Sequence, residues 1–147
     1  MTSNNPHKMK ILFLDVDGVL NSEHSYVDPK SPYPIDAYQV LLVDRIVQAT
    51  GCKIVLSSSW RYMANWREIL KSAAPCLEII DRTDTGRSMR PRGAEVADWM
   101  ALHPEYKIYA ILDDDSDFLE GQPLFRTDWK VGLTEEIANK VIEHLNS

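Results

Sequence analysis

The chain has 147 residues, of which 44% are hydrophobic and 26% are charged, and its formal net charge is −6. This length allows one domain with a buried core, and the composition is that of a globular rather than a disordered chain. No apolar run approaches the ~20 residues of a membrane-spanning helix, and the N-terminus lacks the apolar stretch of a signal peptide. The negative charge argues against a general nucleic-acid coat protein but allows a local basic patch.

The two cysteines, Cys52 and Cys76, each lie in an apolar stretch and match no metal-ligand spacing. We therefore expect both thiols to be reduced and buried, as in a cytoplasmic protein. We expect residues 1–147 to form a single domain.

Short apolar runs alternate with helical patterns along the chain. In chain order the sequence predicts a strand at 10–15, a helix at 36–50, a strand at 52–57, a helix at 61–73, a strand at 76–80, a helix at 92–103, strands at 107–112 and 123–127, and a helix at 134–146. The last helix opens with the capping-box pattern TEEI, in which Thr134 is the N-cap. This alternation predicts a three-layer α/β fold, Rossmann-like, with helices on both faces of a central parallel sheet. Ligands of such sheets bind at the carboxyl ends of the strands, where the strand order reverses.

The first predicted strand ends in two acids. In KILFLDVDGVLN the apolar run at 11–14 is followed by Asp15 and Asp17, and then by Gly18. An Asp-Gly pair alone is a common turn, but a turn needs one acid and a hairpin needs a second strand directly afterwards. The next residues, VLNSEHSYVDPKSPYP, hold three prolines and no alternation, so a hairpin is not expected. The acid pair therefore needs another explanation.

Polar residues also follow two other predicted strands. A run of serines at 57–59 follows the second strand, the acids Asp113, Asp114 and Asp115 follow the fourth, and an arginine-rich segment at 87–92 precedes the fourth. Each feature alone is compatible with a solvated loop. Together they place two acidic clusters at one edge of the sheet, where they would repel each other unless a cation lay between them. Mg²⁺ takes carboxylates and substrate phosphate as ligands, and hydroxyl groups and arginine bind phosphate. The sequence thus predicts a Mg²⁺ site that acts on a phosphate.

These segments resemble the haloacid dehalogenase (HAD) superfamily of phosphatases. The resemblance is carried, in order, by FLDVDGVL at 13–20, IVLSSS at 54–59, Arg90 or Arg92 at the start of the third helix, and AILDDDSD at 110–117. Further segments resemble a narrower group, the small phosphatase domains associated with RNA repair. These segments are IVLSSSWR, RGAEVADW, and ILDDDSD followed by VGLT.

The resemblance implies a role for each matching residue. Asp15 would be the nucleophile that becomes an aspartyl phosphate, with its pKa kept low by the neighbouring cation. Asp17 would be the general acid and base, and its backbone carbonyl would also bind Mg²⁺. Gly18 would permit the sharp turn that lets both acids reach the site.

The remaining matching residues would bind the phosphate and complete the metal site. Ser57 would hydrogen-bond the phosphoryl group, with Ser58 as the rival assignment. Many family members have lysine at the third segment, where this chain offers Arg92, or Arg90 close by. Asp113 and Asp114 would complete the metal site. One would bind directly and the other through water, because adjacent strand residues point to opposite sides.

Substrate choice in this superfamily often depends on a cap domain, and the insertion expected here, at 21–35, is short. We therefore expect an open site that suits an extended substrate, such as an RNA or DNA end with a 3′-phosphate. Arginines at 82, 87, 90 and 92 fall within eleven residues and could contact a strand backbone. Trp60 is either a core anchor or a platform on which a base stacks.

Several alternatives remain open. The enzyme could act on small metabolites, nucleotides or phosphoproteins, or it could be a phosphotransferase or mutase on the same fold. A non-catalytic phosphate-binding module is a further alternative, although every catalytic position is filled. A phosphorelay receiver domain is disfavoured, because it needs an acid at the end of the middle strand, where this chain has Ser57.

Overall fold

The computed structural model describes residues 9–25, 34–59, 63–83 and 91–147. A five-stranded parallel sheet forms its centre, in the order β3-β2-β1-β4-β5. The strands are Met9–Leu14 (β1), Lys53–Leu56 (β2), Ile79–Arg82 (β3), Tyr106–Asp113 (β4) and Leu124–Arg126 (β5). The helices are Ala37–Thr50 (α1), Trp66–Ala73 (α2), Arg92–Leu102 (α3) and Glu135–Leu145 (α4). The predicted three-layer α/β fold is confirmed.

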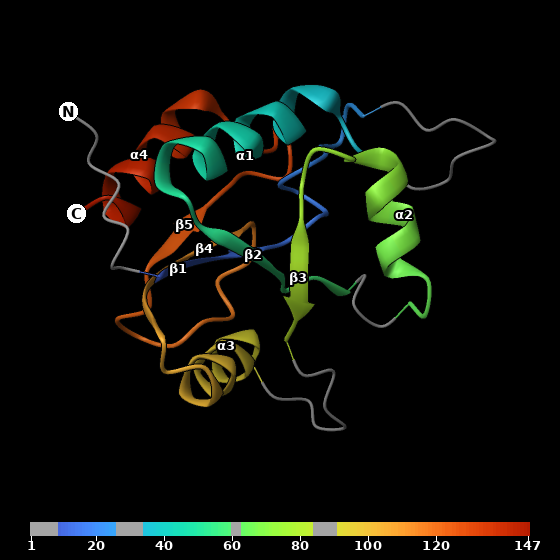
Figure 1. Ribbon diagram of the computed structural model, residues 1–147. Coiled ribbons are helices and arrows are strands. Elements are labelled where there is room, and N and C mark those ends of the chain that lie inside the picture. Colours follow the sequence, from blue (N-terminus) through green and yellow to red (C-terminus); the bar gives the residue numbers. More distant parts are fainter. Residues whose placement is uncertain (1–8, 26–33, 60–62, 84–90) are drawn as a thin grey trace.

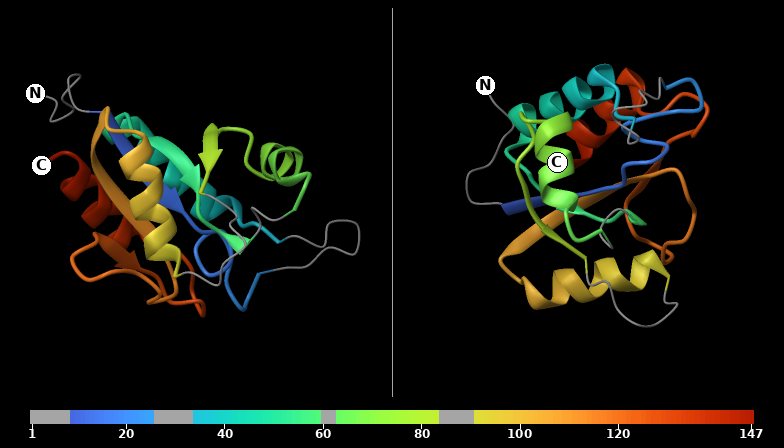
Figure 2. Two further views of the ribbon diagram at one scale, coloured as in Figure 1. Left: turned by 90° about the horizontal axis from the view of Figure 1, so that it is seen from below. Right: turned by 90° about the vertical axis from the view of Figure 1, so that its right-hand side faces the viewer.

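Helices cover both faces of the sheet (Figures 1 and 2). On one face, Leu12 and Leu14 of β1 belong to a core that includes apolar residues of α1 and α4. On the other face, Ile11 and Phe13 pack with Val96 and Trp99 of α3. Since both faces of β1 are covered, its apolar residues run continuously instead of alternating with polar ones.

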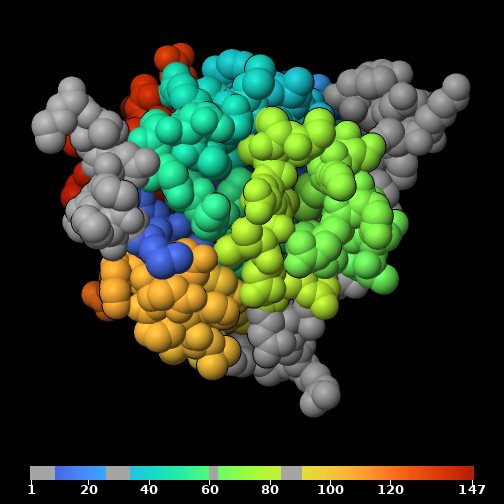
Figure 3. Space-filling view, viewed as in Figure 1, coloured from blue at the N-terminus to red at the C-terminus, as the bar shows by residue number. Residues whose placement is uncertain are grey.

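The strand order reverses between β1 and β4. The chain runs from β1 outward through β2 to β3, and then returns to the other side of β1 for β4 and β5. In the space-filling view, β3 and α2 lie together at the surface beside α1 and α3 (Figure 3). The carboxyl ends of β1 and β4 are therefore where parallel sheets of this kind bind their ligands.

Two predicted elements begin three or more residues away from their positions in the structure. The third strand was expected at 76–80 but runs from Ile79 to Arg82, because a turn at 75–76 follows α2 and Leu77 is already buried in the core before the strand begins. The second helix was expected from residue 61 and begins at Trp66, after a turn at 64–65. None of the helices in the described ranges is long and apolar enough to cross a membrane.

Two local predictions also need correction. Thr134 is the N-cap of α4, as predicted, and its hydroxyl accepts a hydrogen bond from the Ile137 N–H at 3.4 Å. The third helical position is Ile137, however, so no acidic side chain returns the bond as a capping box requires. Both cysteines are free thiols; Cys52 is buried as expected, but Cys76 is exposed in the turn between α2 and β3.

Candidate active site

Asp15 is the first residue after β1, and its backbone is fixed by the sheet. Its N–H donates to the Leu112 carbonyl of β4 at 3.0 Å, which continues the ladder that pairs Leu14 with Leu112. The next pair along this register is Asp15 and Asp113, so the two acids face the same side of the sheet. Both residues are almost fully buried.

Three carboxylates meet at this point. Oxygens of Asp15, Asp113 and Asp114 all lie within 4.8 Å of one another. The expectation that adjacent Asp113 and Asp114 point to opposite sides is wrong, because β4 ends at Asp113 and the strand alternation does not continue to Asp114. Three hard oxygen ligands at this separation are a donor set that suits a cation such as Mg²⁺.

Arg92 is the basic side chain that the structure brings to these acids. It is the first residue of α3, and its Nη1 lies 2.9 Å from Asp113 Oδ2 and 3.5 Å from Asp15 Oδ1. The same nitrogen donates to the Ser57 carbonyl at 3.4 Å. Asp117 holds the start of this helix, since its carboxylate accepts from the Arg92 N–H at 3.2 Å. Arg90, the rival for the basic role, lies outside the described residues.

The protein groups alone disfavour ionisation of these acids. Burial, together with the neighbouring charge of Asp113, raises the pKa of Asp15 from 3.8 to about 9, although Arg92 opposes the shift. Burial also raises the pKa of Asp113. Although burial lowers the pKa of Arg92, the charges of Asp15 and Asp113 raise it overall. The low pKa expected for Asp15 thus requires more positive charge than Arg92 supplies, so the residues present fit a bound cation.

Asp17 lies in a turn next to this cluster. Its side chain is exposed and accepts a hydrogen bond from Asn21 Nδ2 at 3.0 Å, while Asn21 Oδ1 accepts from the Gly18 N–H at 2.9 Å. Gly18 has a φ of +83°, and a Cβ at this position would collide with the Asp114 carboxylate. The turn therefore needs glycine for both its conformation and its closeness to the acids.

The ends of the short insertion after β1 are tied together beside this turn. The Asp36 N–H donates to the Leu20 carbonyl at 2.8 Å, and Asn21 Nδ2 also donates to the Pro34 carbonyl at 2.8 Å. The predicted openness of the site stays a prediction, because residues 26–33, 60–62 and 84–90 lie outside the described ranges. Trp60 and Arg87 fall within these gaps.

The serine run places a buried hydroxyl next to the acids. Ser57 follows β2, its N–H donates to the Leu14 carbonyl at 2.9 Å, and it is only 1% exposed. Its Oγ has no hydrogen-bond partner among the described residues. Ser58 is also buried but already has an interaction partner. Of the two, Ser57 is the one whose hydroxyl is left for a ligand.

Three contributing residues were not assigned a role from the sequence. Asn21 shapes the Asp17 turn and Asp117 anchors α3 beside Arg92. Thr127, after β5, donates from its hydroxyl to the Gly18 carbonyl at 2.6 Å and from its N–H to the Asp113 carbonyl at 2.9 Å. Asn21 lies within the first motif and could have been singled out. Thr127 carries no signal in the sequence, because its partner is 109 residues away.

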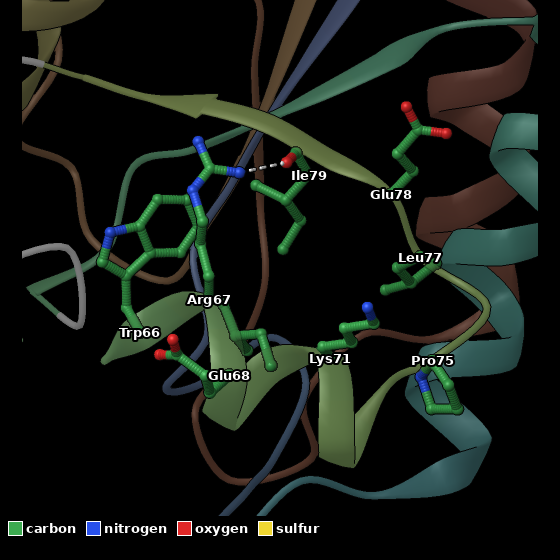
Figure 4. A pocket seen from close by; sticks show the side chains of 9 residues that line it. Trp66, Arg67, Glu68, Lys71, Pro75, Leu77, Glu78 and Ile79 are labelled. Carbon is green, nitrogen blue, oxygen red and sulfur yellow. Dashed lines mark hydrogen bonds between the residues drawn. The ribbon is translucent and has the colours of Figure 1, made fainter. Parts of the chain in front are cut away.

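A separate groove of about 610 Å³ lies between α2 and β3 (Figure 4). The Arg67 guanidinium lies over the Trp66 ring, 4.5 Å from its centroid, and donates to the Ile79 carbonyl at 3.1 Å. The charged lining residues are Arg67, Lys71, Glu68 and Glu78, two of each sign. This groove shares no residue with the acidic cluster, and its balanced charge does not select an anion.

The parallel sheet, its reversal beside the first strand, and an acid cluster next to Arg92 and the buried Ser57 define a domain of the HAD class. Residues 11–138 match the family model described as the HAD domain in Swiss Army Knife RNA repair proteins. The chain therefore belongs to this family, and membership supports a phosphatase-type activity in general. No match was found among curated proteins.

Proposed function

We propose that this protein is a Mg²⁺-dependent phosphomonoesterase that works through an aspartyl phosphate on Asp15. The observation that carries the proposal is the position of the Asp15 carboxylate. It lies at the reversal point of the sheet, within 4.8 Å of the other two carboxylates and 3.5 Å from Nη1 of Arg92. A carboxylate, a guanidinium group and a buried hydroxyl near one another support this proposal, because attack on a phosphate needs a nucleophile, a neutralising charge and a hydrogen-bond donor.

The chemistry takes two displacements. A carboxylate oxygen of Asp15 forms a bond to phosphorus while the bond from phosphorus to the ester oxygen breaks, and Asp17 gives its proton to that leaving oxygen. Asp17 then takes a proton from a water molecule that attacks phosphorus, which releases phosphate and restores Asp15. Ser57 Oγ and Arg92 hold the phosphoryl oxygens during both displacements.

Asp15, Asp113, Asp114 and the backbone carbonyl of Asp17 would hold Mg²⁺, which when bound supplies positive charge to the phosphate oxygens and to the ionised acids. Burial raises the pKa values of Asp15 and Asp113, which supports a bound cation that would favour their ionised forms. Occupancy of this site can be followed without turnover, through the thermal stability of the protein.

For the substrate we propose a nucleic-acid end that carries a 3′-phosphate. Two observations support it: the matching family is described by its place in RNA repair proteins, and Arg82 ends β3 at the same edge of the sheet as the acids. Contacts between arginine and neighbouring phosphates would add affinity beyond the terminal phosphate and make binding depend on salt.

A substrate panel tests this function. RNA and DNA oligonucleotides with 3′- or 5′-phosphate ends are compared with mononucleotides, phosphopeptides and p-nitrophenyl phosphate, each with Mg²⁺ and with EDTA. We expect Mg²⁺-dependent release of phosphate, with a higher kcat/KM for the 3′-phosphorylated oligonucleotide than for the matching mononucleotide, and a decrease of that advantage with salt. A preference for mononucleotides or phosphopeptides would instead assign a different phosphatase substrate, and phosphate transfer to an acceptor would indicate a phosphotransferase. If the protein hydrolyses none of these esters, it is better described as a non-catalytic phosphate-binding module.

Arg82→Gln tests the arginine contribution separately from the chemistry. We expect KM for the oligonucleotide to rise severalfold more than KM for p-nitrophenyl phosphate, because only the oligonucleotide has further phosphates to lose. Arg67→Gln is the matched control, since Arg67 lies over Trp66 on α2. If KM changes equally for the two substrates in the Arg82 variant, a contact between Arg82 and the oligonucleotide backbone is excluded.

A further inference from the structure

Two buried hydroxyls, neither with a hydrogen-bond partner in the described part of the chain, lie side by side at the carboxyl edge of the sheet. Four buried side-chain atoms have no hydrogen-bond partner among the described residues: Gln39 Oε1, Arg45 Nε, Ser57 Oγ and Thr83 Oγ1. Gln39 and Arg45 belong to α1, whereas Ser57 follows β2 and Thr83 follows β3. A buried hydroxyl without a partner is destabilising, so two at one place point to a ligand that supplies the missing bonds.

The strand register places Thr83 directly beside Ser57. Leu56 pairs with Arg82, and the Thr83 N–H donates to the Leu56 carbonyl at 2.9 Å, so the next pair is Ser57 with Thr83. Thr83 is 0% exposed. The ladder thus extends the row of Asp113, Asp15 and Ser57 by one residue, across the strand order β4-β1-β2-β3.

Both hydroxyls face the side of the sheet that α3 covers. Asp81, two residues before Thr83, accepts a hydrogen bond from Trp99 Nε1 of α3 at 2.8 Å. Val55, two residues before Ser57, packs in the same cluster as Trp99. Because side chains two residues apart in a strand share a face, Thr83 and Ser57 point to the side on which Arg92 meets Asp15.

The strand spacing lets one oxygen reach both hydroxyls. Neighbouring strands lie about 4.8 Å apart, and a hydroxyl donates over about 2.7 Å, so an oxygen between the two groups accepts from each. Building on the proposed function, we propose that Thr83 is a second phosphate-binding residue. Its hydroxyl and that of Ser57 together donate to one phosphoryl oxygen, in the substrate and in the released phosphate.

Binding of inorganic phosphate tests this role directly. Isothermal titration calorimetry in the presence of Mg²⁺ compares the wild type with Thr83→Val, which keeps the shape but removes the hydroxyl, and with Thr83→Ser, which keeps the hydroxyl. We expect Kd for phosphate to rise roughly three- to tenfold in the valine variant, the value of one net hydrogen bond, and to stay near wild type in the serine variant. Phosphate binding that is undetectable in the wild type, or equal in the wild type and Thr83→Val, would overturn the proposal.

Two further measurements separate binding from a structural role. Thr50→Val is the matched control, because Thr50 is a buried threonine whose hydroxyl donates to the Ile46 carbonyl at 2.7 Å at the end of α1; it should leave the phosphate Kd unchanged. Thr83→Val should not lower the melting temperature of the phosphate-free protein, since the hydroxyl has no hydrogen-bond partner among the described residues. A lower melting temperature with an unchanged Kd would assign Thr83 a structural role instead.

A double-mutant cycle tests whether the two hydroxyls share one oxygen. If they do, the effects of Ser57→Ala and Thr83→Val on phosphate Kd are coupled and do not multiply independently. Independent effects would contradict a shared oxygen. These binding results can be distinguished from a failure of the proposed function. If the wild type hydrolyses phosphomonoesters but Thr83→Val binds phosphate as well as the wild type does, only the role of Thr83 is refuted. If the wild type hydrolyses no phosphomonoester, the proposed function is refuted.

Discussion

Asp15 occupies surroundings that disfavour its own charge. It is 3% exposed, two further carboxylates lie within 4.8 Å of its own, and the nearest cationic atom among the described side chains, Arg92 Nη1, is 3.5 Å away. A residue with only a structural role here would be better placed as a neutral side chain, since a buried and uncompensated carboxylate is destabilising. The arrangement is therefore better explained by function than by stability.

Replacing Asp15 with asparagine should abolish turnover and leave the fold intact. The amide has nearly the same shape and is neutral, but it cannot form the aspartyl ester, so we expect kcat to fall by roughly a thousandfold or more. Phosphate release and far-UV circular dichroism measure the two effects. Asp44→Asn on α1 is the control and should retain full activity. A variant that keeps more than a hundredth of the wild-type rate would rule out Asp15 as the nucleophile.

Replacing Asp17 with asparagine should impair turnover in a way that depends on the leaving group. Asp17 is exposed and is held by Asn21 in the turn that follows Asp15, and in the proposed function it protonates the ester oxygen. A leaving group of low pKa needs little protonation, so the loss of kcat should be smaller for p-nitrophenyl phosphate than for an alkyl phosphate. Equal losses for the two esters would show that Asp17 is not the general acid.

Some parts of the site and of the fold could be predicted from the sequence, and others could not. Asp15, Ser57 and Asp113 lie at the carboxyl ends of apolar strands, and the parallel order brings such ends to one edge, so their meeting could be predicted from the sequence. The sharp turn at Asp17 could also be expected, because Gly18 permits it and Asn21, which shapes it, lies within the same motif. The link from Thr127 to Gly18 could not be predicted, because these residues are 109 positions apart in the chain. The start of β3 was misplaced because Leu77 is an apolar residue that enters the core before the strand begins.

The N-cap of α4 is a local device whose effect can be measured alone. Thr134 is the N-cap of this helix, and its hydroxyl satisfies the Ile137 N–H. Thr134→Ala should cost about 1 kcal/mol of unfolding free energy, or about 3 °C in melting temperature, whereas Thr134→Ser should retain most of the stability. Urea unfolding followed by circular dichroism compares the three proteins. An alanine variant as stable as the wild type would mean that water replaces the cap without loss.

For the molecule as a whole, the reversal of strand order joins distant parts of the sequence in one charged site. Asp15 comes from the first strand and Asp113 from the fourth, and α3 adds Arg92 over the same edge. The sheet holds these groups through backbone hydrogen bonds, so the acids cannot move apart without breaking the ladder. Their repulsion therefore acts on the stability of the entire fold.

Metal-free protein should lose stability as the pH rises. The folded-state pKa of Asp15 is raised from 3.8 to about 9, mainly by burial and then by Asp113, so between these values the folded state binds more protons than the unfolded state. The free energy of unfolding then falls with increasing pH across this window, and the raised pKa of Asp113 acts in the same direction. Thermal melts in EDTA from pH 5 to pH 8 should show this decrease, and Asp15→Asn should show a smaller one.

Adding Mg²⁺ should reverse the decrease, and most strongly at the higher pH. Bound metal requires ionised carboxylates, so it competes with protons at pH 5 but finds Asp15 and Asp113 more readily ionised at pH 8. We expect the rise in melting temperature on addition of Mg²⁺ to be larger at pH 8 than at pH 5, and to be much reduced in Asp15→Asn. Asp44→Asn should respond like the wild type. A Mg²⁺-induced rise that is equal at the two pH values, or equal in Asp15→Asn and the wild type, would place the metal away from these carboxylates.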